Sequence, residues 1–403
     1  MKNRSNIYTF CSLAMILIFM GIVIIRQKGI MKTQPVTMDF FAMDTVCSIT
    51  IYDMPDFSDN RANEVLNEAR SECERLENLL SATMEDSDIY RINHSASYGS
   101  DTSSSYDIAS TDSLSDSSMP VPSVNCSRET MDVMNKALEY CELSEGRFDV
   151  TIGAVSSLWD FHEDGDHTLP DEKKLSEALE TVDYHNIMIN CQSDTGTDTD
   201  TDIGTNASDT GTDKKKYIDT DIDSSCIITL CNPGSRIDLG AIAKGYCADK
   251  ITSLLKEKGV TSAMINLGGN ICVIGSKPDG SPFTIGIEKP YSYRQDISAK
   301  TDLSNGTIVT CGIYERFFEK DGVKYHHILD PDTGYPVDTD LLSVSVRSDP
   351  GHSADCDALS TVCLLLGYEK ASDLIEKKDG FDALFILKDN SIKTTSHFYS
   401  DQK

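Results

Sequence analysis

Apolar residues recur along this chain with two different periods, and each period predicts one kind of element. From Asn60 to Leu80 they recur every three or four residues with charged residues between them, which predicts an amphipathic helix. From Thr45 to Tyr52 they alternate with other residues, which predicts a strand. The same patterns predict further helices over Arg128–Cys141, Ser353–Leu366 and Glu369–Lys377, and strands over Val260–Ile274, Phe283–Ile287, Ile308–Ile313 and Leu341–Val346. Since strands and helices follow one another without a regular repeat, we expect an α+β fold with mixed sheets flanked by helices.

The first 30 residues differ from the rest of the chain. Tyr8–Ile25 is almost wholly apolar and is long enough to cross a bilayer, if only just. Basic residues flank it on both sides, and no small-residue cleavage site follows. We therefore interpret residues 1–30 as a membrane anchor or uncleaved signal rather than as a buried helix, and residues 31–403 as the folded domain.

The charge is strongly acidic, with a formal net charge of −29, so nucleic-acid binding is not expected. Much of the acid lies in two tracts rich in Asp, Ser and Thr, at about 95–125 and 192–225. Such tracts cannot bury enough apolar surface to offset their ordering entropy, and we predict two disordered inserts. The 13 cysteines form no CxxC pair and no metal-finger spacing, so we expect small core residues rather than a disulfide framework.

The segment Ser235–Asp249 is the most informative motif. A short extended run ends at Gly240, and a helical pattern starts at once, which predicts a strand-to-helix turn with Asp238 at its tip. The exposed amides of a helix start attract phosphate. This segment therefore predicts a site for an anionic ligand.

Two further motifs place unusual turns after strands. The double glycine of INLGGN (Ile265–Asn270) either lets a ligand approach the main chain or makes a plain hairpin turn. In HHILDPDTGYP (His326–Pro336), two histidines precede a rigid Asp-Pro and Thr-Gly turn. A histidine held there is either a general base or a structural residue at a strand end.

A carboxylate and a hydroxyl share one face of a later predicted helix. Asp357 and Thr361 are four residues apart, and hard oxygen ligands of this kind suit Mg²⁺. Helix capping by Asp355 or Asp357 is the alternative, although it does not explain the threonine. In EGRFDVTIG (Glu145–Gly153), an aromatic residue beside a carboxylate suits a ring-bearing ligand, unless the two are a core Phe and a surface Asp.

Seven segments together resemble the ApbE-like family, the FAD:protein FMN transferases. They are MDT (Met43–Thr45), LSATMEDSDIYRIN (Leu80–Asn93), GRFDVTIG, IDLGAIAKGY, INLGGN, HHILDPDTGYP and DALST. Their order along the chain also fits the family, from about Met43 to Leu387, with the two inserts as interruptions. The resemblance implies an ApbE-like, T-fold-related domain.

The family's activity is the Mg²⁺-dependent transfer of FMN from FAD to a threonine of another protein, with release of AMP. The resemblance implies that His327 is the catalytic histidine, because the family's motif puts its histidine directly before the isoleucine; His326 is the less favoured choice. It places Mg²⁺ on the carbonyl of Ala241, the carboxylate of Asp357 and the hydroxyl of Thr361. The residues that it implies as FAD contacts are Met43, Arg147, Phe148, Asp149, Asp238, Lys244 and Ile328.

The chain departs from the family pattern at three positions. Asp44 stands where Gly is frequent, Thr83 where Tyr is frequent, and Lys244 where some relatives carry an acid. The change at Thr83 puts one aromatic flavin contact in doubt. No implied metal ligand is affected.

The implied partners are FAD and an acceptor protein. We expect flavoprotein subunits of membrane redox complexes or extracytoplasmic flavoproteins as acceptors, and a single N-terminal anchor that holds the catalytic domain at the outer side of the cell membrane. Two other functions stay open: a metal-dependent FAD pyrophosphatase that gives FMN and AMP, and a flavin-binding protein without catalytic activity.

Overall fold

A computed structural model describes residues 34–98, 123–161, 165–191, 226–292 and 296–399. The predicted membrane anchor and most of both predicted inserts lie outside these ranges. Within them, none of the helices combines the length and the apolar composition that a membrane span requires.

An eight-stranded sheet forms the centre of the domain, and every pair of neighbouring strands in it is antiparallel. In spatial order the strands are β1 (Val36–Ala42), β2 (Thr45–Asp53), β6 (Ser262–Leu267), β7 (Asn270–Ile274), β10 (Gly306–Gly312), β13 (Leu341–Ser348), β14 (Phe381–Leu387) and β15 (Ile392–Thr394). The strand predicted over Val260–Ile274 is therefore a hairpin of two strands, β6 and β7, with Gly268 and Gly269 between them.

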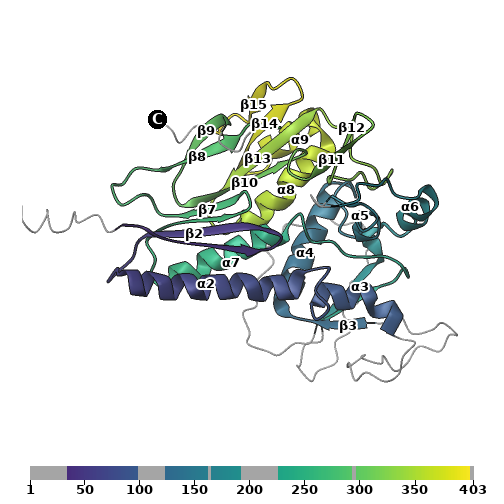
Figure 1. The fold of residues 1–403 in the computed structure, drawn as a ribbon, viewed down its shortest axis with the longest axis horizontal. Coiled ribbons are helices and arrows are strands. Elements are labelled where there is room, and N and C mark those ends of the chain that lie inside the picture. Colours follow the sequence, from purple (N-terminus) through teal and green to yellow (C-terminus); the bar gives the residue numbers. More distant parts are fainter. Residues whose placement is uncertain (1–33, 99–122, 162–164, 192–225, 293–295, 400–403) are drawn as a thin grey trace, which may run out of the picture.

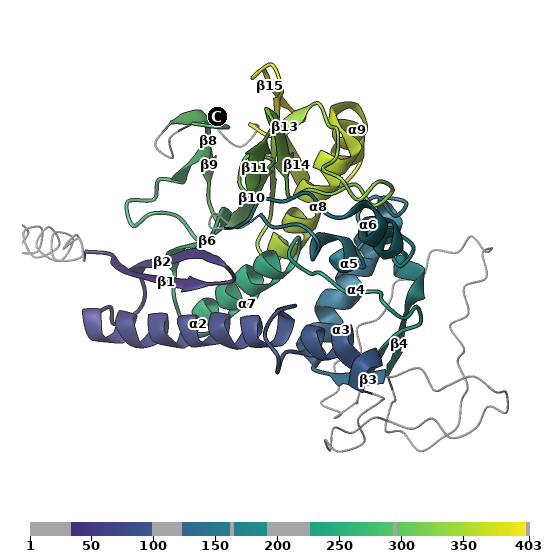
Figure 2. The same ribbon diagram turned by 45° about the vertical axis from the view of Figure 1, so that its right-hand side comes forward.

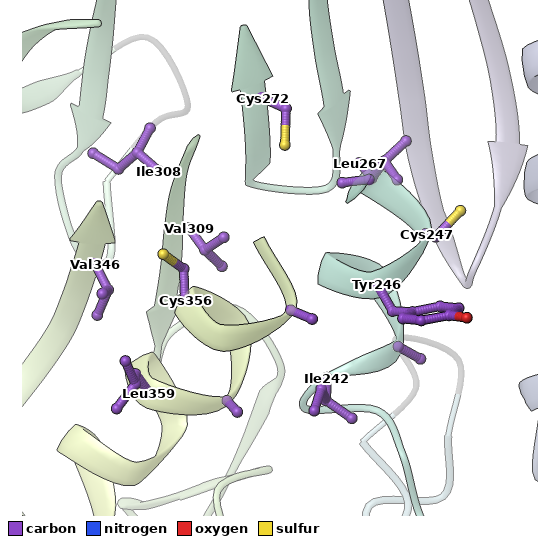
Figure 3. Close-up of a cluster of buried hydrophobic side chains, with 14 of the residues drawn as sticks. Ile242, Tyr246, Cys247, Leu267, Cys272, Ile308, Val309, Val346, Cys356 and Leu359 are labelled. Atoms are coloured by element: carbon purple, nitrogen blue, oxygen red, sulfur yellow. The ribbon is translucent and has the colours of Figure 1, made fainter. Parts of the chain in front are cut away.

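A layer of helices packs along this sheet (Figures 1 and 2). It consists of α2 (Asp59–Leu80), α7 (Ala243–Glu257), α8 (Ser353–Leu366) and α9 (Tyr368–Glu376). Helix α8 is buried almost all round and packs beside α7 against the sheet, with Cys356 and Leu359 close to Val309 and Val346 of the sheet (Figure 3). Apolar burial on both sides of α8 fixes its position in the core.

Smaller elements pack beside the large sheet and complete the α+β fold. They are the sheet β3 (Ser123–Cys126), β5 (Cys226–Leu230) and β4 (Ile187–Cys191); the hairpins β8 (Phe283–Glu288) with β9 (Ile297–Leu303) and β11 (Phe317–Lys320) with β12 (Val323–His326); the helices α3 (Asp88–Tyr98), α4 (Arg128–Leu143), α5 (Gly153–Ser156) and α6 (Glu172–Leu179); and the 3₁₀ turn Tyr184–Asn186. Helix α3 thus runs a few residues into the first predicted insert.

The expectation of no disulfide is wrong at one place. Cys191 and Cys226 are cross-strand partners at the ends of β4 and β5, and their sulfurs are bonded. The two cysteines flank the second predicted insert, so the disulfide joins the chain positions directly before and after that insert. Cys47, Cys272 and Cys363 are buried free thiols, as predicted.

The extended run before Gly240 is not a strand of any sheet. It is joined to the rest of the fold by one parallel bridge between Ile152 and Arg236 and by the side chain of Asn93. The Asn93 amide donates to the Ile237 carbonyl at 2.8 Å and accepts from the Ile237 amide at 2.6 Å. A side chain thereby satisfies the backbone groups that a neighbouring strand would otherwise satisfy.

Helices α7 and α8 cross in very close contact at Gly245. A methyl group added there would lie 2.3 Å from the Ser353 carbonyl oxygen and 2.7 Å from Cα of Ala354. Only a residue without a side chain allows the two backbones to approach this closely. The crossing brings the start of α7 against the first turn of α8.

Replacing Gly245 by Ala is expected to destabilise the protein by about 1–3 kcal/mol, because backbone atoms of α8 must move to admit the methyl group. Urea unfolding followed by circular dichroism measures the loss. Gly286→Ala is the matched control, since the added methyl there meets the exposed side chain of Ile297 rather than a backbone. Equal stability of the two variants would contradict the close crossing.

Candidate active site

Two turns from distant parts of the chain meet at one edge of the candidate site. Met43 and Asp44 form the tip of the β1–β2 hairpin, both with positive φ, and the Met43 amide donates to Glu77 Oε1 at 2.9 Å. The glycine turn of INLGGN packs against this tip, because a methyl group on Gly268 would lie 2.3 Å from Thr45 Oγ1. The double glycine is thus a hairpin turn, and it also allows close packing against MDT.

The two histidines after β12 have different surroundings. His326 is buried in the fold, and its Nδ1 atom has no hydrogen-bond partner. His327 is half-buried, and both its backbone amide (3.1 Å) and its Nδ1 (3.2 Å) contact the carbonyl oxygen of Arg316. Because a carbonyl can only accept, Nδ1 carries the hydrogen and Nε2 keeps a lone pair.

Burial sets the charge of His327. Removal of water lowers the pKa of its imidazole to about 3, and the positive charges of Arg316 and Lys244 act in the same direction. The side chain is therefore neutral at pH 7 in the free protein. A neutral imidazole with a free Nε2 can accept a proton.

The turn after His327 is held rigidly from both sides. The Gly334 amide donates to the Asp330 carbonyl at 2.8 Å, and Arg147 bridges Asp330 at 3.2 Å and Asp332 at 2.8 Å. Trp159 donates from its indole to the Gly334 carbonyl at 2.9 Å. These bonds place Arg147 of GRFDVTIG next to the HHILDPDTGYP motif.

Trp159 lies in a segment without a regular secondary-structure element. Its ring is nevertheless buried in a small aromatic cluster with Phe161, Phe318, Tyr325 and Tyr335. This cluster supports the β11–β12 hairpin, and through it His327.

Asp238 stands at the start of the turn that leads into α7. Its carboxylate accepts from Ser156 Oγ at 2.9 Å and from the Gly240 amide at 2.8 Å, while Lys244 donates to the Gly240 carbonyl at 3.0 Å. Asp149 is buried and accepts from Thr151 and from the Tyr184 amide. The GRFDVTIG and IDLGAIAKGY motifs therefore lie side by side.

Two of the residues implied as FAD contacts are largely covered by protein. Phe148 is buried in the main core, and its amide donates to Ser144 Oγ. Ile328 is also buried, and its carbonyl accepts from Val337. Their contact with FAD, like that of Met43 and Asp149, stays a prediction.

The three residues expected to hold a metal ion lie on the two segments that meet where α7 and α8 cross. The Gly245 amide donates to Asp357 Oδ2 at 2.9 Å, and in a regular helix that amide would donate to Ala241. Among the described residues, no backbone amide donates to the Ala241 carbonyl. Thr361 lies one turn beyond Asp357 on α8, and both side chains are buried. This geometry leaves a carbonyl, a carboxylate oxygen and a hydroxyl as available hard ligands.

The described part of the chain contains no cluster of three or more His, Cys, Asp or Glu side chains that could hold a metal ion. The set around Asp357 offers a single carboxylate together with Ala241 and Thr361. Such a set suits Mg²⁺, which is usually bound through one or two carboxylates together with water and substrate phosphates, and it does not suit Zn²⁺.

Helix capping is not the role of Asp357. The first amides of α8, those of Ser353 and Ala354, donate to the carboxylate of Asp249 on α7, each at 3.0 Å. Asp355 binds Lys136 at 2.6 Å and the Tyr140 hydroxyl at 2.8 Å. Asp249 therefore supplies the cap from another helix, and Asp357 is left to face Gly245.

Glu315 and Arg316 belong to the site and were not predicted. The Arg316 guanidinium donates to the Asp44 carbonyl at 3.3 Å, and Glu315 interacts electrostatically with Lys244 and Asp357. Although Glu315 reaches the protein surface, loss of water around its carboxyl raises the pKa of Glu315 to about 7, and repulsion by Asp357 adds to the rise. Their position along the chain, between β10 and the segment that leads to the HHILDPDTGYP motif, is the sequence feature that could have identified these residues.

Comparisons with known proteins identify the family that this chain resembles. A family model described as "ApbE family" matches residues 43–385. A FAD:protein FMN transferase of Treponema pallidum (strain Nichols) is 34% identical over 277 residues, which are 67% of this chain and 68% of that protein. One of Klebsiella pneumoniae (strain 342) is 31% identical over 273 residues, 68% of this chain and 73% of that protein.

Two solved structures share the fold. The ApbE protein of Thermotoga maritima superposes with a TM-score of 0.68 at 24% identity and covers 91% of this chain and 98% of its own. The flavin transferase ApbE of Vibrio cholerae gives 0.67 at 23% identity with the same coverage. These matches confirm the α+β architecture.

The raised pKa of Glu315 predicts a pH-dependent stability. The carboxyl has a pKa near 7 in the folded protein and an ordinary, lower pKa in the unfolded protein. Its contribution to stability is therefore present below the unfolded pKa and is lost as the pH rises through 7. We therefore expect Glu315→Gln to raise the melting temperature, relative to the unmodified protein, more at pH 8 than at pH 5. The measurement is made without FAD or metal, with the exposed Glu319→Gln as control for charge removal. An equal difference at both pH values would contradict the assignment.

Proposed function

This chain belongs to the ApbE family and is a flavin transferase, and we propose that it uses Mg²⁺ to transfer FMN from FAD to a threonine side chain of an acceptor flavoprotein. The observation that carries the proposal is the bond between the Gly245 amide and Asp357, which leaves the Ala241 carbonyl available beside a carboxylate and the Thr361 hydroxyl. These three oxygens fit the ligand preference of Mg²⁺.

The position of this oxygen set suits a dinucleotide diphosphate. It lies at the start of α7, where the helix dipole favours negative charge, and Lys244 stands in the first turn of that helix. When bound, Mg²⁺ neutralises charge on the diphosphate and makes the phosphorus easier to attack. Ala241, Asp357 and Thr361 would hold the ion, while Lys244 and Asp238 would orient the rest of FAD.

His327 is the proposed general base. Its Nδ1 hydrogen is engaged by the Arg316 carbonyl, so Nε2 is the atom that accepts a proton from the threonine hydroxyl. The threonine oxygen then forms a bond to the FMN phosphorus, the bond from that phosphorus to the bridging oxygen breaks, and AMP leaves with that oxygen. The lowered pKa of His327 keeps its imidazole neutral before the reaction and supports this role.

The acceptor and the location follow from the same proposal. We propose flavoprotein subunits of membrane redox complexes, or extracytoplasmic flavoproteins, as acceptors. The apolar run Tyr8–Ile25 supports attachment to the cell membrane, with the catalytic domain outside the cytoplasm.

The central test is mass spectrometry of an acceptor subunit that is co-expressed with the full chain. We expect a mass increase equal to one FMN on a threonine, and its loss when divalent metal is chelated or when Asp357 is replaced by Asn. Free FMN and AMP without an adduct would favour FAD hydrolysis instead. Neither product would favour a binding protein.

Replacing His327 by Ala is expected to lower the rate of FMN transfer by about 10²–10⁴-fold, the usual contribution of a general base. FAD binding, measured by fluorescence quenching, is expected to persist. His326→Asn is the control, because that ring lies in the protein interior and takes no part in the proposed step. A His327→Ala variant with full transfer activity would disprove the assignment.

A further inference from the structure

Two large apolar side chains are unusually exposed at the end of the β1–β2 hairpin. Phe41 is 69% exposed and Val46 is 61% exposed, far above the buried apolar residues of the same strands. The two residues are cross-strand partners in the sheet register, so they lie next to each other on one face. We name Phe41 and Val46 the hairpin patch.

The core does not require this patch. Along β1 the burial alternates, and Met38, Phe40 and Ala42 turn toward the protein while the patch lies on the opposite, solvent face. The other residues on that solvent face include Thr37, Asp39, Ser48 and Thr50. An apolar pair within a polar surround resembles the anchor of a protein–protein interface.

The hairpin patch is linked through Arg316 to the histidine that we propose as the general base. The hairpin tip is fixed by Arg316, which donates to the Asp44 carbonyl at 3.3 Å. The carbonyl of the same Arg316 accepts the two hydrogen bonds from His327. Figure 1 shows the hairpin at the edge of the large sheet, running along α2 with its tip directed toward α4. The patch therefore lies on a hairpin whose tip is joined through Arg316 to His327, the residue that an acceptor threonine must reach.

We propose that the hairpin patch is the docking surface for the acceptor flavoprotein, and that an apolar side chain beside the modified threonine packs on Phe41 and Val46. The inference rests on the proposed transfer reaction. The second substrate of that reaction is a folded protein, which must cover the surface next to His327 when its hydroxyl reaches Nε2. An exposed aromatic anchor at this place supplies affinity for that substrate without touching FAD.

Substitution of the hairpin patch tests this proposal. Phe41→Thr and Val46→Thr keep residues that favour strands but remove the apolar surface. Each is expected to raise the KM for an acceptor subunit about tenfold, while kcat and the dissociation constant of FAD stay unchanged. The probe is a flavin-free subunit of a membrane redox complex that the unmodified enzyme flavinylates, with the adduct quantified by mass spectrometry.

Two control variants accompany the test. Phe41→Leu keeps an apolar side chain and is expected to retain most of the affinity for the acceptor. Met188→Thr removes a similarly exposed apolar residue, 60% exposed, from β4 in the small sheet, and is expected to leave KM unchanged.

Four results would overturn the proposal. An unchanged KM for the acceptor shows that the patch does not bind it. A loss of FAD affinity together with a lower melting temperature shows that the pair only stabilises the hairpin. A dimer that Phe41→Thr dissociates, seen by light scattering with KM unchanged, shows that a second copy of the chain covers the patch. Failure of the unmodified enzyme to flavinylate any redox-complex subunit contradicts the proposed function itself.

Discussion

The close crossing of α7 and α8 at Gly245 is the constraint on which the rest of the site depends. It lets the Gly245 amide reach Asp357 on the other helix, and it lets Asp249 of α7 cap the first turn of α8. A side chain at position 245 would separate the two backbones. The same contact that packs the core therefore also turns the Ala241 carbonyl from a helix acceptor into an available ligand. The packing of α7 against α8 and the availability of the Ala241 carbonyl therefore have the same structural cause.

Periodic features could be predicted from the sequence because they repeat along the chain. The spacing of apolar residues identified α2, α4, α8 and the main strands, and the four-residue interval between Asp357 and Thr361 identified one helix face. The resemblance between motifs added the family, which the matching family model confirms. Rigid turns after His327 were also visible, since Pro and Gly restrict the backbone locally.

Pairings between distant residues could not be predicted in this way. The capping of α8 by Asp249, the contacts of Asn93 with Ile237 and the disulfide between Cys191 and Cys226 join segments whose separation has no period. Glu315 and Arg316 were missed for a related reason, because their importance comes from what lies around them in space. A predicted strand before Gly240 failed because a single asparagine side chain replaces the partner strand.

The surroundings of His327 explain why two adjacent histidines cannot exchange roles. Strand β12 ends at His326, whose ring enters the protein interior, whereas His327 lies just beyond the strand and turns toward Arg316. Arg316 in turn holds the tip of the β1–β2 hairpin through the Asp44 carbonyl. One residue thus couples the tautomer of the proposed base to the position of the hairpin that borders the site.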